Sequence, residues 1–449
     1  MDAAAHETRP PVLRWADSVG GRPMRLDAGG ILKRFHFLEQ ALVRSSAGWI
    51  PSVHLIETKA LLARIGWETA LTADALRERV FELRFPTRLV EVGADEPLVS
   101  LFRASAHAPS AVAFLEALGT VYLRSLTDAE RAYLEFTDSL ADGPTTRFLL
   151  QSVSEKEQAI AALLDAAEQE RAIATPHDRD ADAKWVVAFG ALLDEAGGVG
   201  AVEPRSVTVP DVVPPGTLYE TPEDPARDPR YFSCNFYWPD TLDPGYGYGS
   251  GVNLQLRSAV SHLNEVWAVE IAGAALYELA DVLGWEFMLD AARWTYDESR
   301  HMLMGQRRLE AWGISPENVP LGRYIYDASA AGGDPIHRLG MLGFFETKNI
   351  GKKNVRAREF GAMGDKLSER DMEFDWADET IHAEYGRRWL KRLLEVNGRP
   401  PQDYADVLEE CSQLVARRVE GAQPGELEAI RDCAERLVGE SEQLLAAAE

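Results

Sequence analysis

Hydrophobic residues along this chain recur mainly with the spacing of α-helices. Long segments rich in Ala, Leu, Glu and Arg place apolar side chains three and four residues apart, as amphipathic helices do. These segments cover residues 30–85, 110–170 and 184–196, and then 256–312, 336–396 and 403–448. No series of alternating apolar and polar residues predicts a sheet, although the short run Val80–Phe85 is ambiguous. The pattern therefore predicts an all-α protein.

The helical pattern is interrupted between residues 197 and 255. Pro, Gly and aromatic residues accumulate there, as in the runs Val213–Gly216 and Asp243–Gly249. The aromatic side chains argue against disorder, so we expect an ordered connector or lid that packs on a helical domain. The predicted domains are a helical domain at 1–196, the connector at 197–255, a second helical domain at 256–400 and a helical tail at 401–449.

The composition argues against several classes of protein. The chain has 449 residues, of which 47 are basic and 72 acidic, and a net charge of −25, which disfavours binding to nucleic acid or to an anionic membrane. The polar residues 1–11 lack the apolar segment of a signal peptide, and no apolar run is long enough to predict a membrane helix. Cys234, Cys411 and Cys433 form no Cys-x-x-Cys pair, which disfavours a disulfide scaffold, a zinc ribbon and a rubredoxin-type iron site. We expect a cytoplasmic protein.

One short pattern occurs twice in the second helical domain. Residues 297–301 read Asp-Glu-Ser-Arg-His, and residues 378–382 read Asp-Glu-Thr-Ile-His. In both copies a Gly lies four residues after the His, and an Arg and a Leu lie two and four residues beyond that Gly. Because the chain has only nine histidines, two matching copies 81 residues apart are a specific signal.

The spacing inside the pattern indicates metal binding. Residues i and i+3 share one face of a helix, so Glu298 with His301, and Glu379 with His382, each present a carboxylate and an imidazole to one point. Such a donor set suits Fe, Mn or Zn. A single Glu-x-x-His is more often a surface ion pair, but two facing copies can hold two metals if two further helices each add a carboxylate.

The positions of glycine indicate which carboxylates these are. In an antiparallel helix hairpin, ligands at one level have the turn midway between them in sequence. Glu270 and Glu298 have their midpoint at Gly284, and Glu346 and Glu379 have theirs inside Gly361–Gly364. Glu265 is a second choice for the first hairpin, with a midpoint at 281.5. The segment Gly313–Pro335 is long enough to cross between the two hairpins.

This constellation resembles the ferritin-like superfamily of dinuclear-metal carboxylate proteins. The resemblance covers residues 256–396 and implies two Fe ions, with Mn or a mixed Mn/Fe pair as alternatives. In the oxygenase and ribonucleotide reductase branch the motif often reads Asp-Glu-x-Arg-His, which the first copy fits, whereas the second has Ile381 in place of Arg. The resemblance also implies that Asp297 and Asp378 orient the histidine nitrogens that do not bind metal. The implied metal ligands are Glu270, Glu298, His301, Glu346, Glu379 and His382.

The first helical domain resembles a degenerate copy of the second, so that the chain is predicted to contain two ferritin-like bundles in tandem. Glu39 and Glu68 are 29 residues apart, close to the 28 between Glu270 and Glu298. Leu71 occupies the position of the first histidine, and Gln158 occupies that of the second, after Glu116 and Glu155. Without histidines, and with Lys156 nearby, this half is expected to act as scaffold or as one wall of the active site.

The resemblance implies a non-heme di-iron oxygenase or oxidase that activates O2 or peroxide. The expected reaction is hydroxylation, N-oxygenation or oxidative desaturation of a small organic molecule, with Tyr277, Trp238 and Tyr246 as candidate pocket residues, for which core packing is the alternative. The chain has no Cys-x-x-Cys pair and no Gly-x-Gly-x-x-Gly motif, so an external reductase or ferredoxin is expected to supply electrons. The sequence leaves open whether the protein forms a homodimer. The alternatives are a ferroxidase for metal storage or detoxification, and a non-catalytic scaffold that the metal staples.

Overall fold

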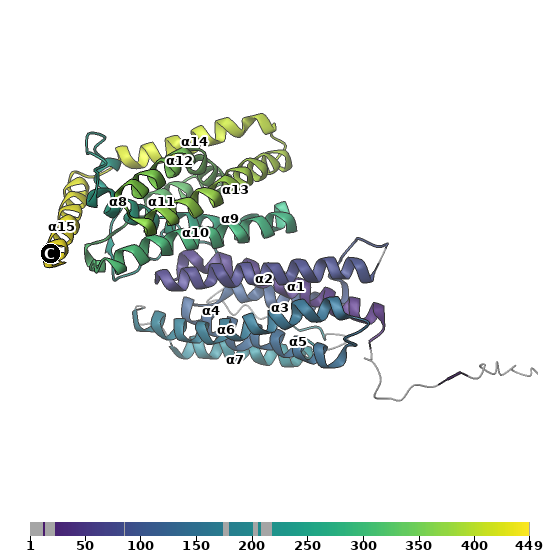
Figure 1. Cartoon of the computed structure of the whole chain (residues 1–449). Helices are drawn as coiled ribbons and strands as arrows, with labels where there is room; N and C mark the ends of the chain where they lie inside the picture. The colour runs from purple at the N-terminus through teal and green to yellow at the C-terminus, as the bar shows by residue number, and fades with distance from the viewer. Residues whose placement is uncertain are drawn as a thin grey trace, which may run out of the picture.

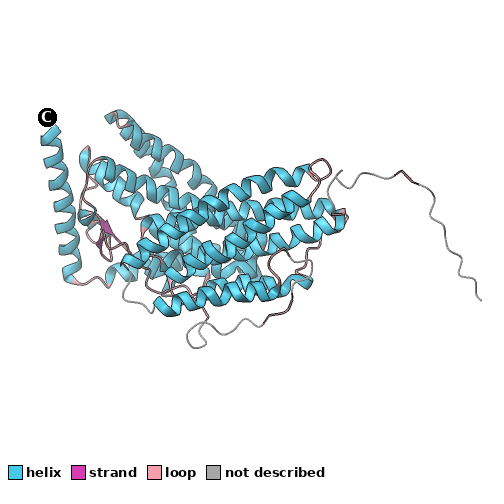
Figure 2. Cartoon of the chain, turned by 90° about the horizontal axis from the view of Figure 1, so that it is seen from below, coloured by secondary structure: helices cyan, strands magenta, loops and turns pink. Residues whose placement is uncertain are grey.

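The protein is almost entirely helical, which confirms the prediction of an all-α chain (Figure 2). The computed structural model describes residues 12–13, 23–84, 86–173, 179–200, 205–207 and 218–448. The two strands found in this part of the chain, β1 (Phe232–Ser233) and β2 (Pro320–Leu321), have two residues each and pair in parallel. None of the described helices combines the length and apolarity needed to cross a membrane.

The N-terminal helices form one side of the molecule (Figure 1). α1 and α2 pack lengthwise on each other after a turn at Pro51, and α2 also contacts α6. A π-helical turn at Leu118–Leu123 continues α4 into α5. The helices of this side are α1 (Arg25–Trp49), α2 (Ile56–Leu83), α3 (Glu96–Arg103), α4 (Ala111–Ala117), α5 (Arg124–Phe136), α6 (Gly143–Ile173) and α7 (Arg179–Ala196).

The C-terminal helices contain two hairpins that turn at the predicted glycines. Gly284 separates α9 from α10 with a φ of 82°, and Gly364 ends α12 before α13 with a φ of 78°, a backbone conformation that favours glycine. The segment between the hairpins carries β2 and α11. The helices are α8 (Val252–Leu263), α9 (Val266–Leu283), α10 (Trp285–Ala311), α11 (Tyr324–Ala330), α12 (Ile336–Met363), α13 (Lys366–Val396), α14 (Tyr404–Glu420) and α15 (Pro424–Ala448).

The two sets of helices pack closely on each other. α1 contacts α9, and α2 contacts α10. A Cβ added at Gly273 of α9 would lie 2.6 Å from the carbonyl oxygen of Ala47 in α1, so only glycine allows this approach of the two backbones. One buried cluster contains Val43 and Ala70 together with Ile271 and Leu276, so the core continues across this contact. The division of the chain into separate domains stays a prediction.

The described part of the connector is irregular but packed. The backbone N–H of Ala226 donates to the carbonyl of Pro51, and Phe236 and Trp238 are buried. The connector also supplies β1, so it lies against the segment that links the two C-terminal hairpins. Residues 201–204 and 208–217, with the predicted proline-rich run Val213–Gly216, lie outside the described residues.

Candidate metal centre

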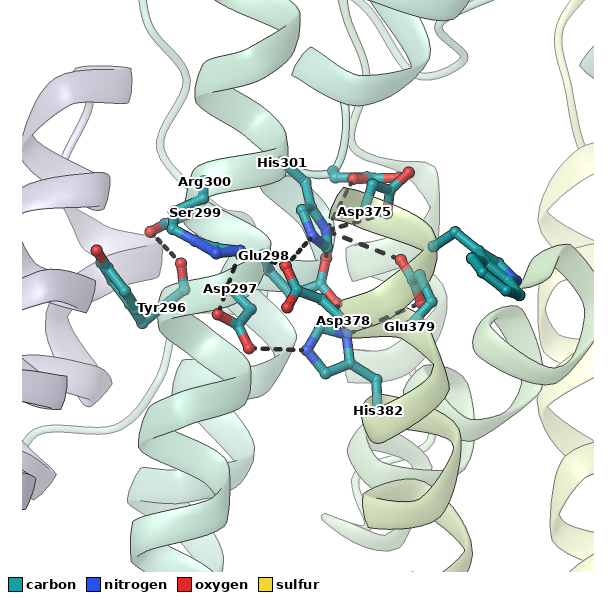
Figure 3. A network of polar contacts seen from close by, with 12 residues as sticks. Tyr296, Asp297, Glu298, Ser299, Arg300, His301, Asp375, Asp378, Glu379 and His382 are labelled. Atoms are coloured by element: carbon teal, nitrogen blue, oxygen red, sulfur yellow. Dashed lines mark hydrogen bonds and ion pairs between the residues drawn. The ribbon is translucent and has the colours of Figure 1, made fainter. Parts of the chain in front are cut away.

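Residues of three helices and of the turn before α9 converge inside the C-terminal half. Glu298 and His301 project from α10, and Glu379 and His382 project toward them from α13 (Figure 3). Each of these four side chains is no more than 3% exposed. Glu346 of α12 and Glu265, which precedes α9, complete the set. We refer to these six residues as the carboxylate–histidine cluster.

The cluster contains two overlapping groups of potential ligands. In each group one atom from every residue lies within 4.8 Å of one atom from all the others. Glu298 and Glu379 belong to both groups, so these two carboxylates lie between the two imidazoles. The first group is Glu265, Glu298, His301 and Glu379, and the second is Glu298, Glu346, Glu379 and His382.

Both histidines turn the same ring nitrogen toward the carboxylates. Nδ1 of His301 lies 3.5 Å from Glu298 Oε2 and 3.8 Å from Glu379 Oε1. Nδ1 of His382 lies 3.0 Å from Glu298 Oε1 and 3.8 Å from Glu379 Oε2. Each carboxylate therefore presents one oxygen to each imidazole.

The other nitrogens of the histidines face aspartates from the opposite motif. Nε2 of His301 lies 3.3 Å from Asp378 Oδ2, and Nε2 of His382 lies 3.5 Å from Asp297 Oδ2. The orienting role predicted for the two aspartates is thus compatible with their positions, and the pairing is crossed between α10 and α13. The crossing follows from the antiparallel contact of the two helices, which places each aspartate beside the other helix's histidine.

Two arginines of α10 offset the charge of these aspartates. Arg293 Nε donates to Asp297 Oδ2 at 2.6 Å, and Arg300 forms ion pairs with both Asp297 and Asp378. The Asp378 pair explains the Arg of the first motif copy, since Arg300 reaches across to the second helix. Ile381, at the matching position of α13, is 42% exposed, so no equivalent arginine contact is made from that side.

A lysine and a further aspartate border the first group of ligands. Lys353 Nζ of α12 lies 2.6 Å from Asp375, 3.2 Å from Glu265 and in direct contact with Glu379. His262 Nε2 lies 3.0 Å from Asp375, and Arg308 donates to His262 Nδ1 at 2.7 Å. The first group is therefore partly neutralised by an ammonium, whereas no lysine or arginine ion pair with Glu346 is found among the described residues.

The pKa values reflect this crowding of buried charge. Burial raises the pKa of Glu265 to about 8, against the lowering effect of Lys353. Burial would also raise the pKa of Glu298, but His301 and His382 hold it well below the usual range. Burial opposes protonation of both histidines, yet the surrounding carboxylates raise their pKa values well above the usual range.

The residues fit a metal pair because several of their buried polar atoms have no hydrogen-bond partner. These atoms are Nδ1 of both histidines and one oxygen each of Glu265 and Glu379, and all of them face the same space. Leaving such atoms without a partner is costly in a protein interior. A cation that binds carboxylate oxygen and imidazole nitrogen satisfies all four, and this donor set suits first-row transition metals. The clusters can thus hold a metal ion, as the sequence predicted.

Glu270, predicted as a ligand, is not part of the cluster. Its carboxylate lies 2.9 Å from Lys59 Nζ of α2 and 2.6 Å from Arg227 Nη1 of the connector, and it is fully buried there. Glu265 lies in the turn before α9, whereas Glu270 lies within the helix and faces α2 and the connector. The structure therefore places the second choice, Glu265, with the other five residues, and Glu270 at the contact between the two halves.

The predicted pocket residues lie elsewhere than at the cluster. Tyr277 is near the far end of α9, where its hydroxyl donates to the carbonyl of Tyr219. Trp238 is buried in the hydrophobic core, and Tyr246 is partly buried against it. Other connector residues do reach the cluster, because Tyr237 and Tyr248 line a cavity of about 650 Å³ whose wall includes Glu265 and Lys353.

In the N-terminal half, only part of the predicted copy lies in the core. Lys156 Nζ of α6 lies 2.7 Å from Glu39 of α1 and 3.1 Å from Glu130 of α5, and all three are buried. Glu68 instead pairs with Arg64, and Leu71 is 46% exposed. Glu116 pairs with Arg171 at the surface, and Glu155 and Gln158 do not join the buried group. An ammonium thus lies between these two buried carboxylates.

Sequence reasoning missed Lys353 and Asp375. Both are visible as helical spacings, because Lys353 is seven residues after Glu346, and Asp375 is four residues before Glu379. His262 likewise lies three residues before Glu265. The spacing rule that found the motif would have found these residues if it had been extended along each helix.

Comparison with known proteins identifies the same part of the chain. Residues 228–422 match the model of a family described as "Protein of unknown function (DUF455)". The match begins in the connector, ends after α14 and includes all six residues of the carboxylate–histidine cluster. No curated protein and no solved structure matches the chain. The comparisons thus indicate that residues 228–422 resemble a protein family, and they give no information on a function.

Proposed function

We propose that the carboxylate–histidine cluster binds two first-row metal ions and that the C-terminal half is a ferritin-like dinuclear-metal domain. The observation that carries this proposal is the set of buried, unpartnered ligand atoms from two matched Asp-Glu-x-x-His helices. The ligands are Glu265, Glu298, His301, Glu346, Glu379 and His382, in which Glu265 replaces the Glu270 of the sequence prediction. Fe is the favoured metal, with Mn or a mixed Mn/Fe pair as alternatives.

On this basis the protein is an oxidoreductase acting on a small organic molecule. A bound iron pair supplies the redox chemistry that activates O2 or peroxide. The chain's own residues hold the ligands in place: Asp378 and Asp297 fix the ring orientation of His301 and His382, and Trp294 donates to Glu298 at 3.1 Å. Lys353 keeps a proton beside Glu379, which offsets part of the carboxylate charge.

The cavity beside Glu265 favours organic oxidation over metal storage. A ferroxidase needs only a path for Fe(II), whereas a cavity of about 650 Å³ has the size of a small-molecule site. Aromatic side chains of the connector line it and would shield the reaction from water, which gives the connector the role of a lid. An external reductase or ferredoxin would supply the electrons. The expected reaction class remains hydroxylation, N-oxygenation or oxidative desaturation.

Anaerobic loading with Fe(II) followed by exposure to O2 tests this proposal. We expect O2 uptake together with a new near-ultraviolet and visible absorption band, both absent from the His301→Ala/His382→Ala variant and retained by Glu68→Ala. A ferroxidase would instead turn over excess Fe(II) without any organic substrate. A scaffold would keep its metal and consume no O2, and either result would contradict the proposed function.

A further inference from the structure

The side chains that line the cavity beside the cluster have a net positive charge, whereas the chain as a whole has a net negative charge. The whole chain carries a net charge of −25, yet five basic and three acidic side chains line this cavity. The basic residues are Arg257, Lys348, Lys352, Lys353 and Arg356, and the acidic residues are Asp240, Glu265 and Glu420. In an acidic protein, such a local excess of positive charge concentrates anions at one place.

Two of these cations have no carboxylate partner. Among the described residues, no ion pair forms with Lys348 or Arg356, and each lies over an aromatic ring, that of Phe344 and that of Tyr248 respectively. Partial burial and the neighbours Lys348 and Arg356 lower the pKa of Lys352, which shows that the positive charges act on one another. Lys348 and Arg356 are therefore available to an incoming anion, whereas Arg257 pairs with Asp240 through one of its terminal nitrogens.

Aromatic groups lie between the cations. The guanidinium of Arg257 lies 3.4 Å from the ring centre of Tyr248, and that of Arg356 lies 4.8 Å from the same ring. Arg257 Nη1 and the Tyr248 hydroxyl are buried without a hydrogen-bond partner. Both atoms are donors with no acceptor, so an anion seated against Tyr248 would satisfy them.

The positions along α12 relate this wall to the cluster. Lys348, Lys352 and Arg356 are four residues apart and so share one face of the helix. At 1.5 Å per residue, Lys352 and Arg356 lie about 9 and 15 Å along the axis from the ligand Glu346. An anionic group held there leaves the other end of a small molecule near Glu265 and Lys353, which line the same cavity.

We propose that this cavity binds a small organic anion, with a carboxylate or phosphate held by Arg257, Lys348 and Arg356 and a planar apolar body packed against the other aromatic side chains of the cavity. This inference rests on the proposed function, since it names the substrate class of that site. The aromatic and cationic groups together predict that neither a neutral ring nor an inorganic ion alone binds well.

Ligand-observed NMR titrations test the proposal with four probes: phenyl phosphate, benzoate, benzyl alcohol and inorganic phosphate. On the metal-free protein we expect phenyl phosphate or benzoate to bind at least about tenfold more tightly than benzyl alcohol, and phenyl phosphate more tightly than inorganic phosphate. The Lys348→Gln/Arg356→Gln variant should weaken the anionic probes by about tenfold or more. The control Lys184→Gln/Arg392→Gln, which removes two exposed cations elsewhere, should not. Equal binding of benzyl alcohol or of inorganic phosphate, or no loss in the variant, would overturn the inference.

Loading with Mn(II) separates this inference from the proposed function. If the probe lies in the cavity, the paramagnetic ion should enhance the relaxation of its protons, and His301→Ala/His382→Ala should abolish that effect without abolishing binding. A protein that binds two metal ions but binds the anionic probes no more weakly after Lys348→Gln/Arg356→Gln would contradict this inference alone. A protein that binds the anions but no metal would contradict the proposed function and leave the anion site standing.

Discussion

At the scale of single residues, each histidine of the cluster divides its two ring nitrogens between different neighbours. Nδ1 faces the glutamates, and Nε2 faces an aspartate that is itself paired with arginine. A carboxylate that accepts from the outer nitrogen fixes the tautomer and makes the inner nitrogen a better metal ligand. The first Asp of each motif therefore acts on the histidine of the other motif.

Removing one of these aspartates should weaken metal binding without removing a ligand. Asp378→Asn eliminates the negative acceptor 3.3 Å from His301 Nε2, and we expect a loss of roughly 10- to 100-fold in metal affinity. A chelator-competition titration measures this loss. Asp432→Asn changes an exposed aspartate of α15 and is the control. An affinity equal to that of the unaltered protein would show that Asp378 does not support His301.

Lys353 should make the two metal positions unequal. Its ammonium contacts Glu379, which both groups share, and Glu265, which belongs to the first group alone, but it makes no ion pair with Glu346 among the described residues. A unit charge at about 4 Å amounts to a few kcal/mol at an effective dielectric constant of about 20. Lys353→Met should therefore strengthen the weaker binding step by roughly tenfold or more in a calorimetric titration, whereas Lys348→Met should not. Weaker binding in Lys353→Met would mean that the lysine supports the metal.

At the scale of helices, the glycine of each motif copy is a site of close packing. A Cβ at Gly305 of α10 would lie 2.5 Å from the carbonyl oxygen of Ala259 and collide with the backbone of α8. A Cβ at Gly386 of α13 would lie 3.0 Å from the Cα of Gly343 in α12. Both glycines therefore bring ligand-bearing helices together, and α8 is the helix that leads to Glu265.

Alanine at these glycines should destabilise the fold. We expect Gly305→Ala to lower the free energy of unfolding by about 1–3 kcal/mol, because the α8 backbone must move, and Gly386→Ala to lower it somewhat less. Gly351, in the middle of α12 with open space around its Cα, is the matched control, and Gly351→Ala should stabilise by up to about 1 kcal/mol. Urea unfolding measures all three. Equal effects at Gly305 and Gly351 would contradict the packing account.

The same scale shows how far the sequence could predict the site. Helical spacing and turn glycines located both hairpins, since Gly284 and Gly364 carry the φ values that only glycine adopts readily. Helical spacing could not decide between Glu265 and Glu270. The helix is broken between Leu263, where α8 ends, and Val266, where α9 begins, so Glu265 does not follow the spacing of α9. That break depends on Asn264, which accepts from Gly322 N–H and donates to the carbonyl of Pro320. These contacts are long-range and leave no periodic pattern.

At the scale of the whole molecule, a buried ionic group joins the two halves. Lys59 of α2, Arg227 of the connector and Glu270 of α9 meet there, with Lys59 and Glu270 fully buried. The N-terminal half contains a comparable buried group, in which Lys156 lies between Glu39 and Glu130. The halves thus differ in what offsets these central carboxylates: a lysine in the N-terminal half, and two histidines together with Lys353 in the C-terminal half.

Glu270→Gln should affect stability and leave metal binding intact. It leaves Lys59 and Arg227 buried without a counter-charge, so we expect the free energy of unfolding to fall by about 3–5 kcal/mol. Urea unfolding measures the fall, and metal analysis of the folded protein should give the same stoichiometry as the unaltered chain. Loss of metal from a folded Glu270→Gln protein would return Glu270 to the ligand set.

Metal content per chain tests the central claim most directly. The protein is loaded with Fe(II) or Mn(II) without O2, freed of weakly bound ions and analysed by elemental mass spectrometry. The account predicts about two ions per chain, a sharp decrease in His301→Ala, His382→Ala and Glu265→Gln, and no decrease in Glu68→Ala or Glu155→Ala. Full occupancy in the His301→Ala/His382→Ala variant would show that the carboxylate–histidine cluster is not the metal centre.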